Sequence, residues 1–301
     1  MIERPTVLVL GAGASIPLGY PSGFELTTQI IVGANENEPL GQFLRRSFRD
    51  EPALIQFRED LFRCSLPSID RFLENRPEYT EIGKASIAFI LLQSEVESDL
   101  FGRATKNWYP RLFKELTSNG FDMFSLNALS IVTFNYDRSL EQFLFGALKA
   151  SFNRTDKETA AAIGAIPIYH MYGDLGPLPW SSSGANSHPY ETRNDSKWPT
   201  IVDASRSIRV VSDRDEAKLF ELVRDKILIA ERVHFLGFGF DQTNFDRLNI
   251  PWDTEPKQKY YGTSSGLGQI AQAHFEHTLT KKKLALHAVE IHEYFHNNSA
   301  F

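Results

Sequence analysis

A glycine-rich loop follows the first apolar run of the chain. The run Thr6–Leu10 leads directly into Gly11-Ala12-Gly13-Ala14-Ser15, and Gly19-Tyr20-Pro21-Ser22-Gly23 follows before a helical stretch begins. Closely spaced glycines at the end of a strand let backbone amides approach a pyrophosphate, and the N-terminus of the next helix favours its negative charge. The pattern is typical of a dinucleotide site, although a tight turn alone would also account for the glycines.

The same loop disfavours a hydride-transfer enzyme. The dehydrogenase fingerprint needs a third glycine at the position of Ile16, and it needs a second strand that ends in an acidic residue about 20 positions later. The sequence has neither feature.

A second candidate segment is Thr133-Phe134-Asn135-Tyr136-Asp137, where an apolar run meets the start of a helical pattern. Ligands of open parallel sheets bind at the carboxyl ends of the strands, so these side chains are expected to face the same crevice as the glycine loop. A helix cap would explain Asp137. It does not explain Asn135, whose amide can both donate and accept hydrogen bonds.

Two further segments end strand-like runs in the same way. Tyr169-His170-Met171-Tyr172-Gly173 contains a histidine, the side chain that exchanges protons near neutral pH, although such a residue taken alone is more often structural. In the segment 235–240, Gly237 and Gly239 end another run, and Asn244 follows. These residues could accept a second part of the same nucleotide.

Alternating strands and helices must position these segments. Apolar runs of strand length occur at 6–10, 131–134, 166–170, 208–211, 233–236 and 286–291, and helical patterns follow several of them. This alternation predicts an α/β fold with a Rossmann-like parallel sheet and helices on both faces.

The middle of the chain has a different character from its flanks. Helical patterns occur at 52–62, 68–75, 85–100 and 107–118. We interpret residues 36–125 as a helical module inserted into a single domain, whose Rossmann-like core is formed by residues 1–35 and 126–301.

Composition excludes several classes of protein. Apolar residues make up 42% of the 301 residues, which suits a globular core, and no apolar run has the roughly 18 to 20 residues that a membrane-spanning helix needs. With no secretory leader recognisable at the start, a cytoplasmic location is expected. The net charge of −6 argues against strong direct binding of nucleic acid. The single cysteine, Cys64, cannot form a disulfide framework or a four-thiolate zinc site.

Taken together and in this order, the segments resemble the sirtuin superfamily. The resemblance rests on GAGAS and GYPS within 11–22, TFNYD at 133–137, His170 in YHMYG and GFGF at 237–240. SIDRFLEN at 68–75 and GKASIAFILL at 83–92 are similar to the helical module of sirtuin-like NAD-hydrolysing proteins of bacterial anti-phage defence.

Two departures from the family pattern disfavour protein deacylation. Deacylases of the superfamily carry a zinc ribbon held by four thiolates, which one cysteine cannot supply, so no zinc is expected. Their arginine-bearing loop is also unmatched, because Pro21 is followed by Ser22-Gly23-Phe24.

The resemblance instead implies an NAD glycohydrolase, which cleaves its substrate NAD to nicotinamide and ADP-ribose. It implies that Asn135 holds the attacking water or the ribose hydroxyls, that His170 acts as general base and that Asp137 orients this network. It also assigns a set of NAD contacts, namely Gly11, Ala12, Gly13, Ser15, Pro21, Thr133, Gly237 and Asn244.

The resemblance further implies an NAD-depleting effector of antiviral defence by abortive infection. Such an effector is expected to form a homo-oligomer and to be regulated by a separate sensor partner, such as a HerA-type DNA-translocating ATPase or an Argonaute-type protein. Three alternatives stay open: a non-catalytic sensor that binds NAD or ADP-ribose, an assembly subunit of a defence complex, and a DNA-cleaving effector, for which the sequence offers no convincing metal ligands.

One motif resembles a zinc-protease site. His292-Glu293-Tyr294-Phe295-His296 has the HExxH spacing, but that chemistry requires a helix. Apolar Val289 and Ile291 alternate with polar residues, which predicts a strand, where positions i and i+4 lie about 13 Å apart. No metal is therefore expected here.

Overall fold

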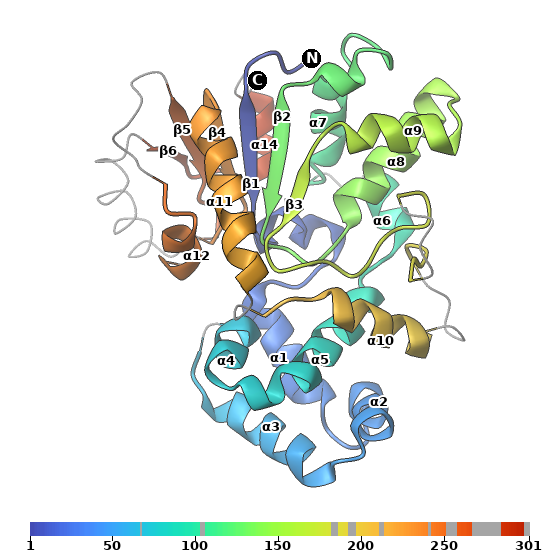
Figure 1. Cartoon of the computed structure of the whole chain (residues 1–301), viewed down its shortest axis with the longest axis vertical. Helices are drawn as coiled ribbons and strands as arrows, with labels where there is room; N and C mark the ends of the chain where they lie inside the picture. The colour runs from blue at the N-terminus through green and yellow to red at the C-terminus, as the bar shows by residue number, and fades with distance from the viewer. Residues whose placement is uncertain are drawn as a thin grey trace.

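The computed structural model describes residues 1–66, 68–102, 106–181, 186–191, 197–210, 214–239, 242–250, 258–266 and 284–297. This part of the chain forms a sheet covered by helices, and a second group of helices lies beyond one end of the strands (Figure 1). Within these ranges, no helix is long and apolar enough to cross a membrane.

The sheet has six parallel strands in the order β3-β2-β1-β4-β5-β6. The strands are β1 (Thr6–Leu10), β2 (Leu129–Thr133), β3 (Ile168–His170), β4 (Arg232–Leu236), β5 (Lys259–Thr263) and β6 (Leu284–His287). Every residue of β1, with the sequence TVLVL, is buried, as expected of a central strand covered on both faces. The prediction of a Rossmann-like α/β fold is confirmed.

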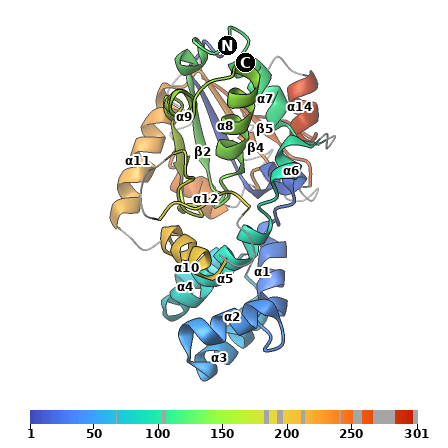
Figure 2. The ribbon, with the colours of Figure 1, turned by 90° about the vertical axis from the view of Figure 1, so that its right-hand side faces the viewer.

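Helices cover both faces of the sheet (Figures 1 and 2). On one face lies α11 (Arg214–Ile229), which buries Val223 and Ile227. On the other lie α7 (Tyr109–Leu116), α8 (Ser139–Phe152) and α14 (Ile291–Asn297). The shorter helices α6 (Glu97–Phe101) and α9 (Asp156–Gly164) pack against α8.

The second group of helices lies beyond the carboxyl ends of the strands (Figure 1). It consists of α1 (Gly23–Gly33), α2 (Pro39–Phe48), α3 (Glu51–Arg63), α4 (Ile69–Asn75), α5 (Thr80–Gln93) and α10 (Lys197–Ser207). Side-chain caps begin three of these helices, at Ser22, Asp50 and Ser68. The group includes α1 and α10 from outside residues 36–125, whereas α6 and α7 from inside that range pack beside the sheet.

The structure differs from the predicted strands at three places. Ile208 forms only an isolated bridge with Gly173, so the expected strand at 208–211 is wrong in its described part. The strand β5 was not predicted, because KYYGT contains no run of aliphatic residues. The expected strand at 286–291 is replaced by β6, a turn and the start of α14.

The strand order places the ends of β1 and β4 at a topological switch point, since the chain proceeds from β1 to one side of the sheet and returns to β4 on the other. In open α/β sheets this is where the connecting loops diverge and leave a crevice. Gly11 follows β1 and Gly237 follows β4, so two of the glycines singled out from the sequence lie there.

We expect Gly237→Ala to lower the free energy of unfolding by about 2 kcal/mol or more. Gly237 has φ +56°, and an added Cβ would lie 2.2 Å from the Ala14 nitrogen. The matched control is Gly239→Ala, whose Cβ would meet open space, so we expect a change within about 0.5 kcal/mol. Equal denaturant midpoints for the two variants would contradict the close contact of the two loops.

Candidate functional site

The two loops at the switch point touch through their backbones. The Gly11 amide donates to the Leu236 carbonyl at 3.1 Å, and the Gly13 amide donates to the Gly237 carbonyl at 3.0 Å. A Cβ on Gly11 would lie 2.7 Å from the Gly237 oxygen, and a Cβ on Gly13 would lie 2.8 Å from the Gly237 Cα. These glycines allow the close approach of the two loops, and their amides bind the neighbouring loop.

A cleft lies between this edge of the sheet and the helices α1 and α4. It consists of an inner and an outer pocket, which share Ala12, Gly23, Asp70, Phe134 and Asn135. The outer pocket has a volume of about 290 Å³. Among the other lining residues, Ser15, Tyr20, Pro21 and Asp137 belong to the inner pocket, and Gly11, Phe24, Arg71, Glu74, Tyr172, Phe238, Gly239 and Asn244 to the outer one.

Asn135 lies where the two pockets meet, and its backbone amide and side chain donate three hydrogen bonds. Its backbone amide donates to Thr133 Oγ1 at 3.1 Å, and its side-chain nitrogen donates to the Gly11 carbonyl at 3.0 Å and to Ser15 Oγ at 3.1 Å. The side-chain oxygen has no hydrogen-bond partner among the described residues. It can therefore accept a hydrogen bond from a ligand hydroxyl or from water.

Asp137 lines the inner pocket and is linked to Asn135 through Ser15. Ser15 Oγ donates to Asp137 Oδ2 at 2.7 Å, and both the amide and the hydroxyl of Ser139 donate to Asp137 Oδ1. Burial raises the pKa of Asp137, although the hydrogen bonds from Ser139 and Ser15 oppose this rise. The structure thus brings Ser15, Asn135 and Asp137 into one chain of polar contacts.

His170 does not line this cleft. It contributes instead to a separate pocket beside β3, together with Asp174, Arg206 and Arg209. Its Nδ1 donates to the Asn135 carbonyl at 3.0 Å, and its Nε2 donates to Glu141 Oε1 at 2.7 Å.

The charge state of His170 follows from these contacts. Burial alone lowers its pKa, but the charge and hydrogen bond of Glu141 outweigh burial and raise the pKa to about 9. His170 is therefore an imidazolium at neutral pH, with both nitrogens bound. In this arrangement it holds the Asn135 backbone and has no nitrogen available to accept a proton.

Tyr172 lies in the cleft, and the sequence analysis did not single it out. Its hydroxyl donates to Asn244 Oδ1 and accepts a hydrogen bond from Arg247 Nη1 at 2.8 Å. Its ring packs edge-on against Phe134, with the ring centroids 5.6 Å apart. The chain leaves β3 at His170 and turns, so side-chain direction at Tyr172 no longer follows the alternation of a strand.

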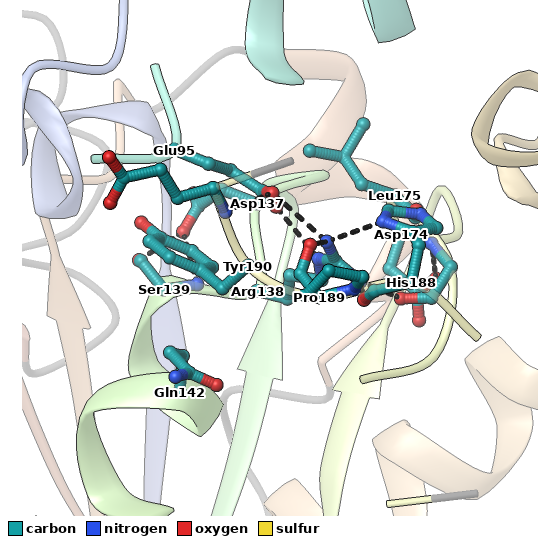
Figure 3. A network of polar contacts seen from close by, with 12 residues as sticks. Glu95, Asp137, Arg138, Ser139, Gln142, Asp174, Leu175, His188, Pro189 and Tyr190 are labelled. Atoms are coloured by element: carbon teal, nitrogen blue, oxygen red, sulfur yellow. Dashed lines mark hydrogen bonds and ion pairs between the residues drawn. The ribbon is translucent and has the colours of Figure 1, made fainter. Parts of the chain in front are cut away.

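A buried network around Arg138 supports the inner pocket (Figure 3). Arg138 pairs with Glu95 through two hydrogen bonds of 2.7 and 2.9 Å, and the side chains are only 3% and 0% exposed. Its remaining donors bind the loop that follows β3, at the carbonyls of Gly176, Pro177, His188 and Pro189 and at His188 Nδ1. Burial and the charge of Arg138 lower the pKa of His188, so its Nδ1 is an acceptor.

The HExxH segment is helical, so the prediction of a strand is wrong. The chain turns after β6, and Glu293 then accepts a hydrogen bond from the Glu290 amide and caps α14. His296 Nδ1 lies 2.5 Å from Arg111 Nη2, a cation that would repel a metal ion. Nowhere in the described part of the chain do three His, Cys, Asp or Glu residues come together in a way that could hold a metal.

A comparison with protein families bears on the same edge of the sheet. Residues 129–249 match the family model of the SIR2-like domain. This part of the chain is similar to a SIR2-like domain. The matched range includes Asn135, Asp137, His170 and Asn244. The glycine loop of residues 11–23 lies outside it and contacts it through the backbone of Leu236 and Gly237. No curated protein matches the chain.

We expect Arg138→Met to lower the free energy of unfolding by about 3 to 5 kcal/mol, because it leaves Glu95 buried without its partner. The matched control is Arg63→Met. Arg63 pairs with Glu59 at 3.3 Å on the surface, with side chains 69% and 44% exposed, so we expect a change below about 1 kcal/mol. Denaturant unfolding measures both, and equal losses would contradict the role of burial.

The pKa of His170 predicts a pH dependence of stability. Because it rises from 6.5 to about 9 on folding, the ion pair with Glu141 stabilises the protein fully below pH 6.5 and loses this effect as the pH rises to 9. The excess stability of the wild type over His170→Gln should therefore fall by about 3 kcal/mol between pH 6 and 9.5. Glu141→Gln should remove the same pH dependence. A constant difference between wild type and His170→Gln would contradict the imidazolium.

Proposed function

We propose that this protein binds NAD in the cleft and hydrolyses the bond between nicotinamide and ribose. The observation that carries the proposal is the position of Asn135, whose amide nitrogen is fixed by Gly11 and Ser15 at the junction of the two pockets. The similarity to a SIR2-like domain supports the choice of NAD, since such domains are compatible with NAD binding or cleavage.

The leaving group needs no activation by an acid. The ring nitrogen of nicotinamide is cationic in NAD, so the glycosidic bond breaks with its electron pair going to that nitrogen and without protonation. The enzyme must then stabilise an oxocarbenium-like ribose and place a water molecule next to it. The side-chain oxygen of Asn135 accepts a hydrogen bond from this water or from a ribose hydroxyl.

The proton of the attacking water needs an acceptor. In our proposal Ser15 takes this proton while it gives its own to Asp137, along the hydrogen bond of 2.7 Å that joins them. The raised pKa of Asp137 favours its acceptance of the proton. His170 acts as a positioning residue through the Asn135 carbonyl, so the general-base role expected of it passes to Asp137.

The biological role extends the same proposal. We propose that the protein depletes NAD as an effector of bacterial antiviral defence, that it acts as a homo-oligomer and that a separate sensor, such as a HerA-type ATPase or an Argonaute-type protein, switches it on. The resemblance of the helical segments at 68–75 and 83–92 to those of such effectors supports this role.

The position of His170 favours a second candidate function. Both imidazole nitrogens of His170 are bound, and His170 does not line the cleft. The cleft therefore lacks the general base that the sequence predicts. A protein that binds NAD or ADP-ribose without cleaving it, as a sensor or as a subunit of a complex, would need the cleft but no such acceptor.

The deciding experiment measures NAD loss, nicotinamide release and NAD binding by the purified protein. We expect Asn135→Ala to lower turnover about 100-fold or more, with thermal unfolding close to that of the wild type. The control Asn37→Ala alters an exposed asparagine between α1 and α2 that does not line the cleft, and it should leave turnover unchanged.

Other outcomes separate the two candidate functions. NAD binding without turnover would favour the non-catalytic binder. Turnover that survives in Asn135→Ala would contradict the assignment of the site, and a wild type that neither binds nor cleaves NAD would contradict both functions.

A further inference from the structure

A dinucleotide brings two negative charges to the cleft, and two of the backbone amides expected to receive them already have partners. The Gly11 and Gly13 amides donate to carbonyls of the neighbouring loop at 3.1 and 3.0 Å. A diphosphate in a partly buried site needs charged or amide donors, because losing its hydration without such partners is costly. Charged side chains around the outer pocket can supply such donors.

Arg71 lines this pocket, and Arg247 lies behind its lining residues Tyr172 and Glu74. Arg71 lies on α4, and Arg247 is the last residue of α12 (Gln242–Arg247), beyond the carboxyl end of β4. Glu74 binds both, since its Oε2 accepts from Arg71 Nη1 at 2.8 Å and its Oε1 lies 2.9 Å from Arg247 Nη1. Glu74 is 12% exposed, so this pairing is partly desolvated.

One guanidinium nitrogen of Arg247, Nη1, already has partners within the protein. Its Nη1 donates to the Tyr172 hydroxyl at 2.8 Å, and the same hydroxyl donates to Asn244 Oδ1. Tyr172, Asn244 and Glu74 all line the outer pocket. Among the described residues, the other guanidinium nitrogens of Arg247 have no partner. A planar guanidinium has five donors and binds phosphate oxygens in pairs.

Helix α4 sets the charge balance of the cleft. Asp70 and Glu74 are four residues apart and so share one face of the helix, and both line the outer pocket. Asp70 accepts a hydrogen bond from the Tyr136 hydroxyl, and burial raises its pKa. Glu74 is the carboxylate that pairs with both arginines and that a bound diphosphate would meet as a like charge.

We propose that Arg247 and Arg71 bind the diphosphate of the dinucleotide, and that Glu74 orients both arginines while limiting affinity by its charge. The proposal rests on the proposed function, because it assigns a part of the same ligand. It makes the site specific for ligands with a diphosphate, such as NAD and ADP-ribose, over nucleosides that lack phosphate.

The test is binding of ADP-ribose, which is not consumed, measured by calorimetry with the full chain. We expect Arg247→Gln to weaken binding roughly 10- to 100-fold, the loss typical of a charge-assisted hydrogen bond, and Arg71→Gln to weaken it less. Glu74→Gln should strengthen binding several-fold, because it removes a like charge and keeps the shape. The surface control Arg63→Gln should leave affinity unchanged.

The opposite effects on affinity expected for Arg247→Gln and Glu74→Gln distinguish a binding role from a structural one. If Arg247 and Glu74 only held the fold together, both substitutions would weaken binding and lower the unfolding temperature. Arg71, which is 38% exposed, provides a variant that is expected to fold even if Arg247→Gln does not.

Two controls distinguish the failure of this proposal from that of the proposed function. A wild type that binds neither NAD nor ADP-ribose would overturn the proposed function. Binding of ADP-ribose that is unchanged within twofold in Arg247→Gln and Arg71→Gln would overturn the arginine assignment alone. Equal affinity of the wild type for nicotinamide riboside and ADP-ribose would also overturn it, because the former has no phosphate.

Discussion

The buried ion pair of Arg138 and Glu95 fixes the geometry on which the cleft depends. A guanidinium removed from water is tolerated only when its donors all find partners, and here those partners are a carboxylate and four carbonyls of the loop after β3. These hydrogen bonds fix the position of that loop. It places Tyr190 with its hydroxyl 2.8 Å from that of Tyr20, which lines the inner pocket, and it holds the chain next to Asp137 (Figure 3).

The ion pair of Arg138 and Glu95 links two parts of the molecule. Glu95 follows α5 of the helical group, and Arg138 precedes α8 beside the sheet. The ion pair therefore joins the two groups of helices on either side of the cleft. A second polar junction, formed by Glu74 of α4 with Arg247 of α12, joins them at the outer pocket. Charged side chains of α4 thus line the outer pocket, while the glycines serve the close approach of two backbone loops.

Much of the fold could be predicted from the sequence because its signals are local. The apolar runs of β1, β2 and β4 and the capped helices carry their own periodicity and end signals. The rule that parallel strands present their carboxyl ends at one edge was enough to predict that Ser15, Asn135 and Asp137 lie together. Prediction failed where contacts with other segments decide the local structure. Ile208 lies in an apolar run of strand length but pairs only with Gly173. The alternation at 289–292 continues into a helix capped by Glu293.

The sequence by itself determined the parallel sheet, the loops at its edge and the types of polar residues placed there, because each follows from composition and spacing along a short stretch of chain. Only the tertiary structure decided which of those side chains enter the cleft. His170 turns away to Glu141, while Tyr172, two residues later, enters the cleft and meets Asn244 and Arg247. The direction of a side chain beyond a strand end depends on the turn and on charged partners from distant segments, and no local pattern encodes those partners.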